Sequence, residues 1–231
     1  MSGTFRIAED VVWMPSAWAF DAILDWVATE VTPHDAALAD DLRASSAAVT
    51  GYGFAEVADL SEERFRGLVT AAESVLDRLL LGPLDAVGGP DYFQGLSSAL
   101  ILLVTLLRAD GRNAQGEHRH GEILLPHGED WTAPDWVHDL VVEHLAIDAA
   151  VEGRDPVPVL AGRVRRGTGV LDLRLSPDAF RDRVLPALRR LVTDYGDGIR
   201  GLGRAPDLEP VLAAAVLLLA QQAGLDVDHA E

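Results

Sequence analysis

Apolar residues recur along this chain at helical spacing, and shorter apolar runs lie between the helical stretches. Helices are expected at residues 15–31, 35–47, 61–79, 96–107, 134–151 and 211–220, and from Ser176 onward. The candidate strands are the short apolar segments 4–8, 54–58, 122–125 and 170–175. Helices outweigh strands, so the predicted class is a helix-rich α+β fold with small sheets.

The order of these elements repeats in the two halves of the chain. The matched blocks are Trp13-x4-Trp18 with Trp131-x4-Trp136, Gly51-Tyr52-Gly53 with Gly167-Thr168-Gly169, Ser61-x3-Phe65 with Ser176-x3-Phe180, and Pro90-Asp91 with Pro206-Asp207. The sequence offset between matched blocks stays between 115 and 118 residues. Four chance matches would not share so nearly constant an offset. We interpret the chain as a diverged tandem duplication of a strand-helix-strand-helix-helix unit.

The first repeat is expected to span residues 1–110 and the second residues 120–231, joined by a polar linker at 109–121. The second half carries the sequence DPVPV at 155–159, which predicts a loop where the first half has its short helix. The last helix of each half is apolar nearly all round. We therefore expect these two helices to be the most buried elements and to pack together across a pseudo-twofold axis.

The composition excludes several classes of protein. The 231 residues are 48% hydrophobic and contain no cysteine, which excludes disulfide frameworks, thiolate nucleophiles and zinc fingers. All 19 basic residues are arginine, so there is no lysine for a Schiff base or a P-loop. The net charge of −18 disfavours general nucleic-acid binding. The N-terminus lacks the apolar run of a secretory signal, and no apolar run reaches the ~20 residues of a membrane span, so a cytoplasmic protein is expected.

The charge is distributed unevenly. Residues 1–153 hold 26 acidic residues and eight arginines, whereas residues 154–204 hold six acidic residues and 11 arginines. Arg163, Arg165 and Arg166 are the candidate docking residues of this segment for an acidic partner or a phosphate. The alternative is that these arginines pair with the protein's own carboxylates.

Five of the seven histidines lie between residues 118 and 144, close to several carboxylates. His118, His120 and His127 could bind a first-row metal ion, because imidazole is a common ligand for such ions. The alternative is that His118 and His120 belong to a solvated linker. No nucleophile-elbow motif or isolated carboxylate pair occurs, so no catalytic or cofactor-binding residue is predicted.

Three functions remain open on this basis. The first is a non-enzymatic, acidic protein that binds a protein partner, such as an immunity protein or antitoxin that masks a basic partner. The second is a metal-assisted enzyme or small-molecule binder with a site between the repeats, in which only the second repeat is functional. The third is a scaffold subunit, which an exposed apolar patch beside the last helices would favour.

Overall fold

The computed structural model of the chain describes residues 2–46, 52–113, 119–126, 130–165, 167–199 and 202–226. Contacts divide the chain into two compact units. The first unit comprises residues 1–115 and 201–206, and the second comprises residues 116–200 and 207–231. The short segment 201–206 therefore belongs to the first unit, although the chain on both sides of it belongs to the second. The domain boundaries at 110 and 120 stay a prediction.

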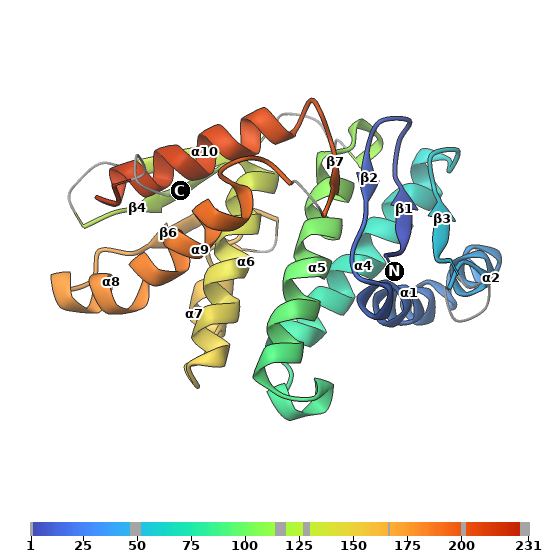
Figure 1. The fold of residues 1–231 in the computed structure, drawn as a ribbon, viewed down its shortest axis with the longest axis horizontal. Coiled ribbons are helices and arrows are strands. Elements are labelled where there is room, and N and C mark those ends of the chain that lie inside the picture. The colour runs from blue at the N-terminus through green and yellow to red at the C-terminus, as the bar shows by residue number, and fades with distance from the viewer. Residues whose placement is uncertain are drawn as a thin grey trace. The chain divides into compact units, whose positions relative to one another are not determined.

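The first unit is a small mixed sheet covered by helices (Figure 1). Its elements are β1 (Thr4–Arg6), β2 (Val12–Trp13), α1 (Ala17–Val31), α2 (Ala36–Ala44), β3 (Phe54–Glu56), α4 (Glu62–Leu81), the 3-10 helix η1 (Leu84–Val87), α5 (Pro90–Ala109), the 3-10 helix η2 (Gly111–Asn113) and β7 (Gly203–Arg204). The strand order is β3-β1-β2-β7. β1 is parallel to β3, and β2 is antiparallel to both of its neighbours.

The second unit has a three-stranded sheet of order β5-β4-β6 among its described residues. Its elements are β4 (His120–Leu124), β5 (Asp130–Pro134), α6 (Asp135–Val151), α7 (Val157–Leu160), β6 (Val170–Asp172), α8 (Pro177–Arg183), α9 (Leu185–Tyr195) and α10 (Glu209–Gln222). β4 pairs antiparallel with β5 and parallel with β6. The predicted helix-rich α+β class is confirmed.

The two sheets share their strand register. Phe5 stands opposite Trp13 in the first sheet, and Ile123 stands opposite Trp131 in the second, at a common offset of 118 residues. The parallel pairs agree in the same way, because Phe5 faces Ala55 and Ile123 faces Leu171.

A close approach of backbone to ring also recurs in both units. A Cβ atom at Gly3 would lie 2.2 Å from the ring of Phe20, and one at Gly121 would lie 2.1 Å from the ring of His138. Glycine therefore lets the backbone at Gly3, just before β1, and at Gly121, in β4, lie directly on an aromatic side chain of the first long helix of its unit.

The cores follow the predicted helical pattern in part. Phe65, Leu68 and Leu76 on α4 are buried as expected, and the Ser61 hydroxyl caps this helix by accepting a hydrogen bond from the Arg64 amide at 3.4 Å. α5 is long and apolar enough to cross a membrane, but 67% of its most apolar window is buried in the fold, which is typical of a core helix. The prediction that α10 is one of the most buried helices is wrong, because Val211 and Leu218 are half exposed and α6 is more buried than α10.

Other elements also differ from those predicted. The second strand of each unit, β2 or β5, was not expected. α7 forms where the DPVPV sequence predicted a loop. The single helix expected after Ser176 is divided into α8 and α9, because Pro186 in the first turn of α9 has no N–H to continue the helical hydrogen bonds.

The first residues of the predicted linker pack against the first unit. The Arg112 guanidinium donates hydrogen bonds to the backbone oxygens of Ile7, Val57 and Ala58 at 2.6–2.9 Å. It also lies 3.9 Å from the centroid of the Phe65 ring. Residues 110–113 therefore close one end of the first sheet.

Candidate functional site

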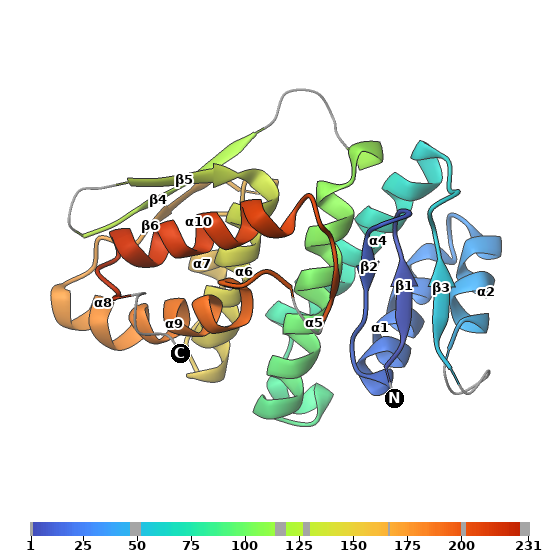
Figure 2. The ribbon, with the colours of Figure 1, turned by 45° about the horizontal axis from the view of Figure 1, so that its top comes forward.

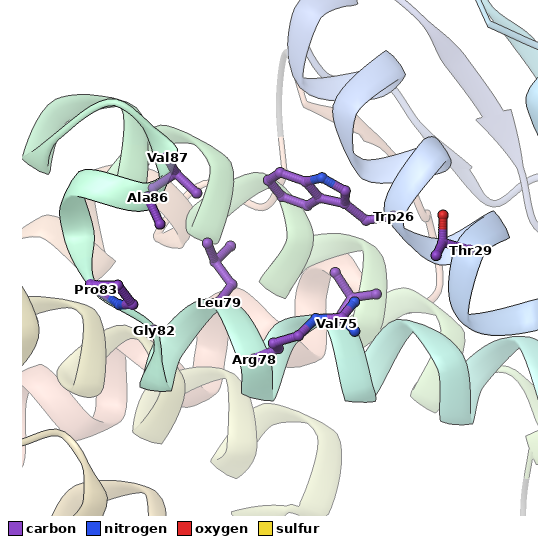
Figure 3. Close-up of a pocket in the computed structure, with 9 residues that line it drawn as sticks. All are labelled: Trp26, Thr29, Val75, Arg78, Leu79, Gly82, Pro83, Ala86 and Val87. Carbon is purple, nitrogen blue, oxygen red and sulfur yellow. The ribbon is translucent and has the colours of Figure 1, made fainter.

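The first unit contains a mostly apolar pocket between α1, α4 and η1 (Figure 3). Figure 3 shows Trp26 on α1 facing Ala86 and Val87 across the pocket, with Leu79 rising from α4 between them. The pocket volume is about 410 Å³. Sites for small ligands have this form, concave and apolar with few polar groups. The full lining is Trp26, Thr29, Val75, Arg78, Leu79, Gly82, Pro83, Ala86 and Val87.

The turn after α4 shapes one end of the pocket. A Cβ atom at Gly82 would lie 2.8 Å from the backbone oxygen of Arg78, so glycine allows the chain to turn closely against the end of the helix. Pro83 precedes η1, and this 3-10 turn carries Ala86 and Val87 to the pocket. Ala86 is itself exposed, so it forms part of the rim rather than of the core.

The polar groups of the pocket are gathered at one corner. Arg78 forms an ion pair with Glu30 of α1, and the Ser74 hydroxyl donates a hydrogen bond to the same carboxylate at 3.2 Å. The Thr29 hydroxyl donates to the backbone oxygen of Asp25 at 2.8 Å. The remaining surface offers apolar contact only, so the pocket would hold an apolar group beside one charged pair.

A second, more polar cavity of about 710 Å³ lies between α1, α2 and α4. Glu30 and Ser74 line it, so it adjoins the charged corner of the apolar pocket. Asp35 and Arg64 line this cavity and form a bidentate ion pair, with N–O distances of 2.6 and 3.2 Å. Hydrogen bonding from Arg64 holds the pKa of Asp35 below its usual value. Glu63 adds a third carboxylate to the lining.

Two exposed carboxylates are adjacent in the sequence to residues that line the apolar pocket. Asp25 and Asp85 precede the lining residues Trp26 and Ala86 in the sequence, and both are exposed. Neither forms an ion pair with another described residue. Exposed carboxylates attract cationic groups and disfavour anionic ones.

A second group of polar residues lies buried along α6 of the second unit. His138, Asp139 and Glu143 are completely buried. The Asp139 carboxylate accepts a hydrogen bond from the Val164 amide at 2.7 Å and lies 3.2 Å from Nδ1 of His138. These side chains hold the loop before β6 onto α6, and their burial keeps them from contact with a dissolved substrate.

The C-terminal half of α6 carries a buried histidine, His144. Nε2 of His144 is hydrogen-bonded to the Tyr195 hydroxyl at 3.0 Å. Burial lowers the pKa of His144 to about 4, and the nearby Arg190 guanidinium contributes to the same shift. Burial also raises the pKa of the Tyr195 hydroxyl. His144 is therefore neutral near pH 7 and joins α6 to α9.

The predicted metal ligands are only partly placed. His118 and His127 lie outside the described residues, and His120 is exposed at the start of β4. In the described part of the chain, no group of three or more histidine, aspartate or glutamate side chains is placed to hold a metal ion. The predicted three-histidine site therefore stays a prediction.

The predicted docking arginines face the protein's own carboxylates where they are described. Arg163 is buried, with Nη1 3.6 Å from Glu143 Oε1. Arg165 lies with Nη2 3.4 Å from Asp135 Oδ2, and Arg166 is outside the described residues. This geometry favours the alternative of internal pairing, so the candidate site is placed in the first unit instead.

Sequence reasoning missed the pocket because its residues look like ordinary core positions. Val75 and Leu79 belong to the apolar face of α4, and only the structure shows that they leave a pocket beside η1. One signal was present. Four of the five tryptophans fall in the matched pairs of the two halves, whereas Trp26 does not. Comparison with protein-family models, with curated proteins and with solved structures finds no match to this chain.

Proposed function

We propose that the chain is a non-enzymatic, acidic binding protein, of the kind that masks a basic protein partner as immunity proteins and antitoxins do. The observation that carries this proposal is the apolar Trp26 pocket, in which the lining residues Trp26 and Ala86 each follow an exposed aspartate in the sequence. A partner would insert one large apolar side chain into the pocket, where burial beside an aromatic ring gives most binding energy. Its basic residues would lie near Asp25 and Asp85 and would accelerate association.

A selection from a library of random displayed peptides tests this function. We expect enrichment of peptides that carry one large apolar residue flanked by arginine or lysine, with association that slows as salt is added. Ala86→Arg fills the pocket from its exposed rim, and it should weaken the selected peptides about tenfold or more. Ala37→Arg, at an exposed position of α2, makes the same chemical change away from the pocket and should leave affinity unchanged. Equal binding by both variants, or enrichment of acidic peptides, would contradict the proposal.

The repeated architecture supports the proposal that the chain arose by tandem duplication. Both units contain two antiparallel strands, a long helix, a short helix, a strand parallel to the first, and then further helices. The shared register and the two glycine–ring contacts support the same origin. On this proposal the apolar pocket is a feature of the first copy, because His144 of the second copy matches Trp26 at an offset of 118 residues.

The pocket also favours a second candidate function, the binding of a small molecule. Its volume of about 410 Å³ falls within the usual range of small-ligand pockets. The metal-assisted form of this candidate would use His118, His120 and His127. Metal analysis of the purified protein, repeated on His120→Ala, tests it. Stoichiometric metal that is lost in the variant would support it, and metal-free protein would remove it.

The scaffold candidate is favoured by the exposed apolar side chains of α10. Val211 and Leu218 lie seven residues apart on one helix and are 42% and 46% exposed. Sedimentation at increasing concentration tests whether this helix joins copies of the chain. A species that stays at 24.8 kDa would argue against a self-assembling scaffold.

A further inference from the structure

At one edge of the first sheet, the extended segment β7 pairs with β2. The two strands are antiparallel, with Gly203 opposite Trp13 and Arg204 opposite Val12. The Met14 amide donates a hydrogen bond to the Leu202 oxygen at 2.7 Å. Figure 2 shows the red β7 beside the blue β2, although the two strands are far apart in the sequence. The edge of β2 is thus covered by a late segment of the chain.

The corresponding edge of the second sheet is that of β5. Trp131 in β5 matches Trp13 in β2, since each stands opposite the same position of the neighbouring strand. Within the described residues, β5 pairs with β4 alone. Asp130 and Thr132 of β5 are exposed. The Trp131 indole donates to the Ala215 oxygen of α10 at 3.0 Å, so α10 lies against β5. None of the described strands pairs with the outer edge of β5, which corresponds to the edge that β7 covers in the first sheet.

The register shows which backbone groups face outward from β5. The Glu122 amide donates to the Gly169 oxygen at 2.8 Å, so the peptide groups of Glu122 face β6. Those of Ile123 face β5 and meet Trp131, because peptide groups alternate in direction along a strand. The backbone N–H and C=O groups of Asp130 and Thr132 therefore point away from β4. The same groups of Val12 and Met14 in the first sheet point toward β7.

β7 also indicates the chemistry of a suitable occupant. A Cβ atom at Gly203 would lie 2.3 Å from the Val12 oxygen, so the residue opposite the tryptophan must be glycine for so close an approach. The next residue, Arg204, stands opposite Val12. The residue that matches Val12 in the second sheet is Asp130. A basic residue at this position of the occupant would therefore face a carboxylate across the strands.

We propose that the edge of β5 binds an extended segment of a partner protein that contains an apolar residue, a glycine and an arginine or lysine in succession. The segment lies antiparallel to β5, with its glycine opposite Trp131 and its basic residue opposite Asp130. The Thr132 amide donates to the backbone oxygen of its apolar residue. Strand addition of this kind takes affinity from main-chain hydrogen bonds and specificity from the side chains. This site is independent of the Trp26 pocket.

A synthetic peptide with the sequence of residues 202–206, Leu-Gly-Arg-Ala-Pro, is the probe. Added to the full chain, it should slow hydrogen exchange of the Thr132 amide. Replacing its glycine by alanine should abolish the effect. Asp130→Arg should weaken the peptide about fivefold and favour a peptide in which glutamate replaces arginine. Thr132→Pro removes the outward N–H without removing a bond to β4, and it should abolish binding.

Each contrary result is distinct. Protection at Met14 instead of Thr132 would mean that the peptide only displaces β7. Protection of Thr132 that grows with protein concentration without peptide would identify a second copy as the occupant. An unchanged Thr132 amide at saturating peptide, or equal affinity of Asp130→Arg for the arginine and glutamate peptides, would also overturn the proposal. Asp130→Asn removes the charge with little change in shape, so it isolates the contribution of the charge. Thermal unfolding of every variant checks that each one is folded. Ala86→Arg should bind the peptide as the wild type does.

Discussion

The imidazole of His138 stacks on the indole of Trp131, with ring centroids 6.3 Å apart and planes at 20°. Trp13 and Phe20 form the matching pair of the first unit, at 6.1 Å and 24°. The two ring pairs have similar geometry, although the second unit has a histidine where the first has a phenylalanine. The histidine then needs polar partners, which the Asp139 carboxylate and the Glu122 backbone oxygen provide at 3.2 and 3.4 Å.

Gly121→Ala should destabilise the protein, because its Cβ would lie 2.1 Å from the ring of His138. We expect a loss of about 1–3 kcal/mol in the free energy of unfolding, as for other overpacked cores. A Cβ atom at Gly67 on α4 would meet no neighbouring group within 4 Å, so Gly67→Ala should instead stabilise the protein by about 1 kcal/mol. Urea unfolding followed by tryptophan fluorescence measures both. Equal effects would show that the strand does not lie on the ring.

Stability should fall as the pH drops from about 6.5 to about 4, because the pKa of His144 is lowered to about 4 in the folded protein. Between these values the unfolded chain binds a proton at this histidine and the folded chain does not. The loss from His144 should reach about 3 kcal/mol. Burial raises the pKa of Asp148 above its usual value, so its protonation acts in the opposite direction as the pH falls.

The His144 contribution is isolated by comparing the wild type with His144→Phe across this pH range. The difference in unfolding free energy between them should change with pH by the amount that His144 contributes. A difference that is independent of pH would show that His144 titrates normally in the folded state.

Arg112→Met should cost roughly 3 kcal/mol of stability, because it leaves three backbone oxygens without their charged donor. Arg66 is the matched control. It forms an exposed ion pair with Glu62 one helical turn away, so Arg66→Met should change stability by less than about 0.5 kcal/mol. Chemical denaturation of the two variants tests this difference. Similar losses would mean that residues 110–113 are the solvated linker that the sequence predicted.

Gly203→Ala should detach β7 from β2, because its Cβ would lie 2.3 Å from the Val12 oxygen. The Met14 amide then loses its bond to Leu202 and should exchange with solvent about tenfold faster or more. The Thr4 amide, which donates to Gly53 on the other side of the sheet, is the internal control and should keep its rate. Unchanged exchange at Met14 would contradict this placement of β7.

The fold was predictable from the sequence where apolar spacing alone decides the structure. The long helices α1, α4 and α6 and the strands beginning at Thr4 and Phe54 follow from local pattern and from turn residues. β7 could not be predicted, because Gly203 and Arg204 have no strand propensity and pair only through contacts made at long range. The burial of Arg163 escaped prediction for the same reason, since its partner Glu143 lies on a different element.

The candidate site was not predictable, because a pocket depends on space that side chains leave unfilled. The sequence shows that Val75 and Leu79 are apolar, but not that η1 stands away from them. The unmatched Trp26 was the one available signal. An unmatched tryptophan does not by itself indicate a pocket.

The most direct test of the proposed binding function is the indole N–H spectrum of the ¹⁵N-labelled protein with a peptide selected for binding. The five tryptophans give five indole signals, and Trp26→Phe assigns the one from the pocket. Saturating peptide should shift the Trp26 signal and leave those of the buried Trp13 and Trp131 in place. A Trp26 signal that does not move while the peptide is bound would contradict the assignment of this pocket as the binding site.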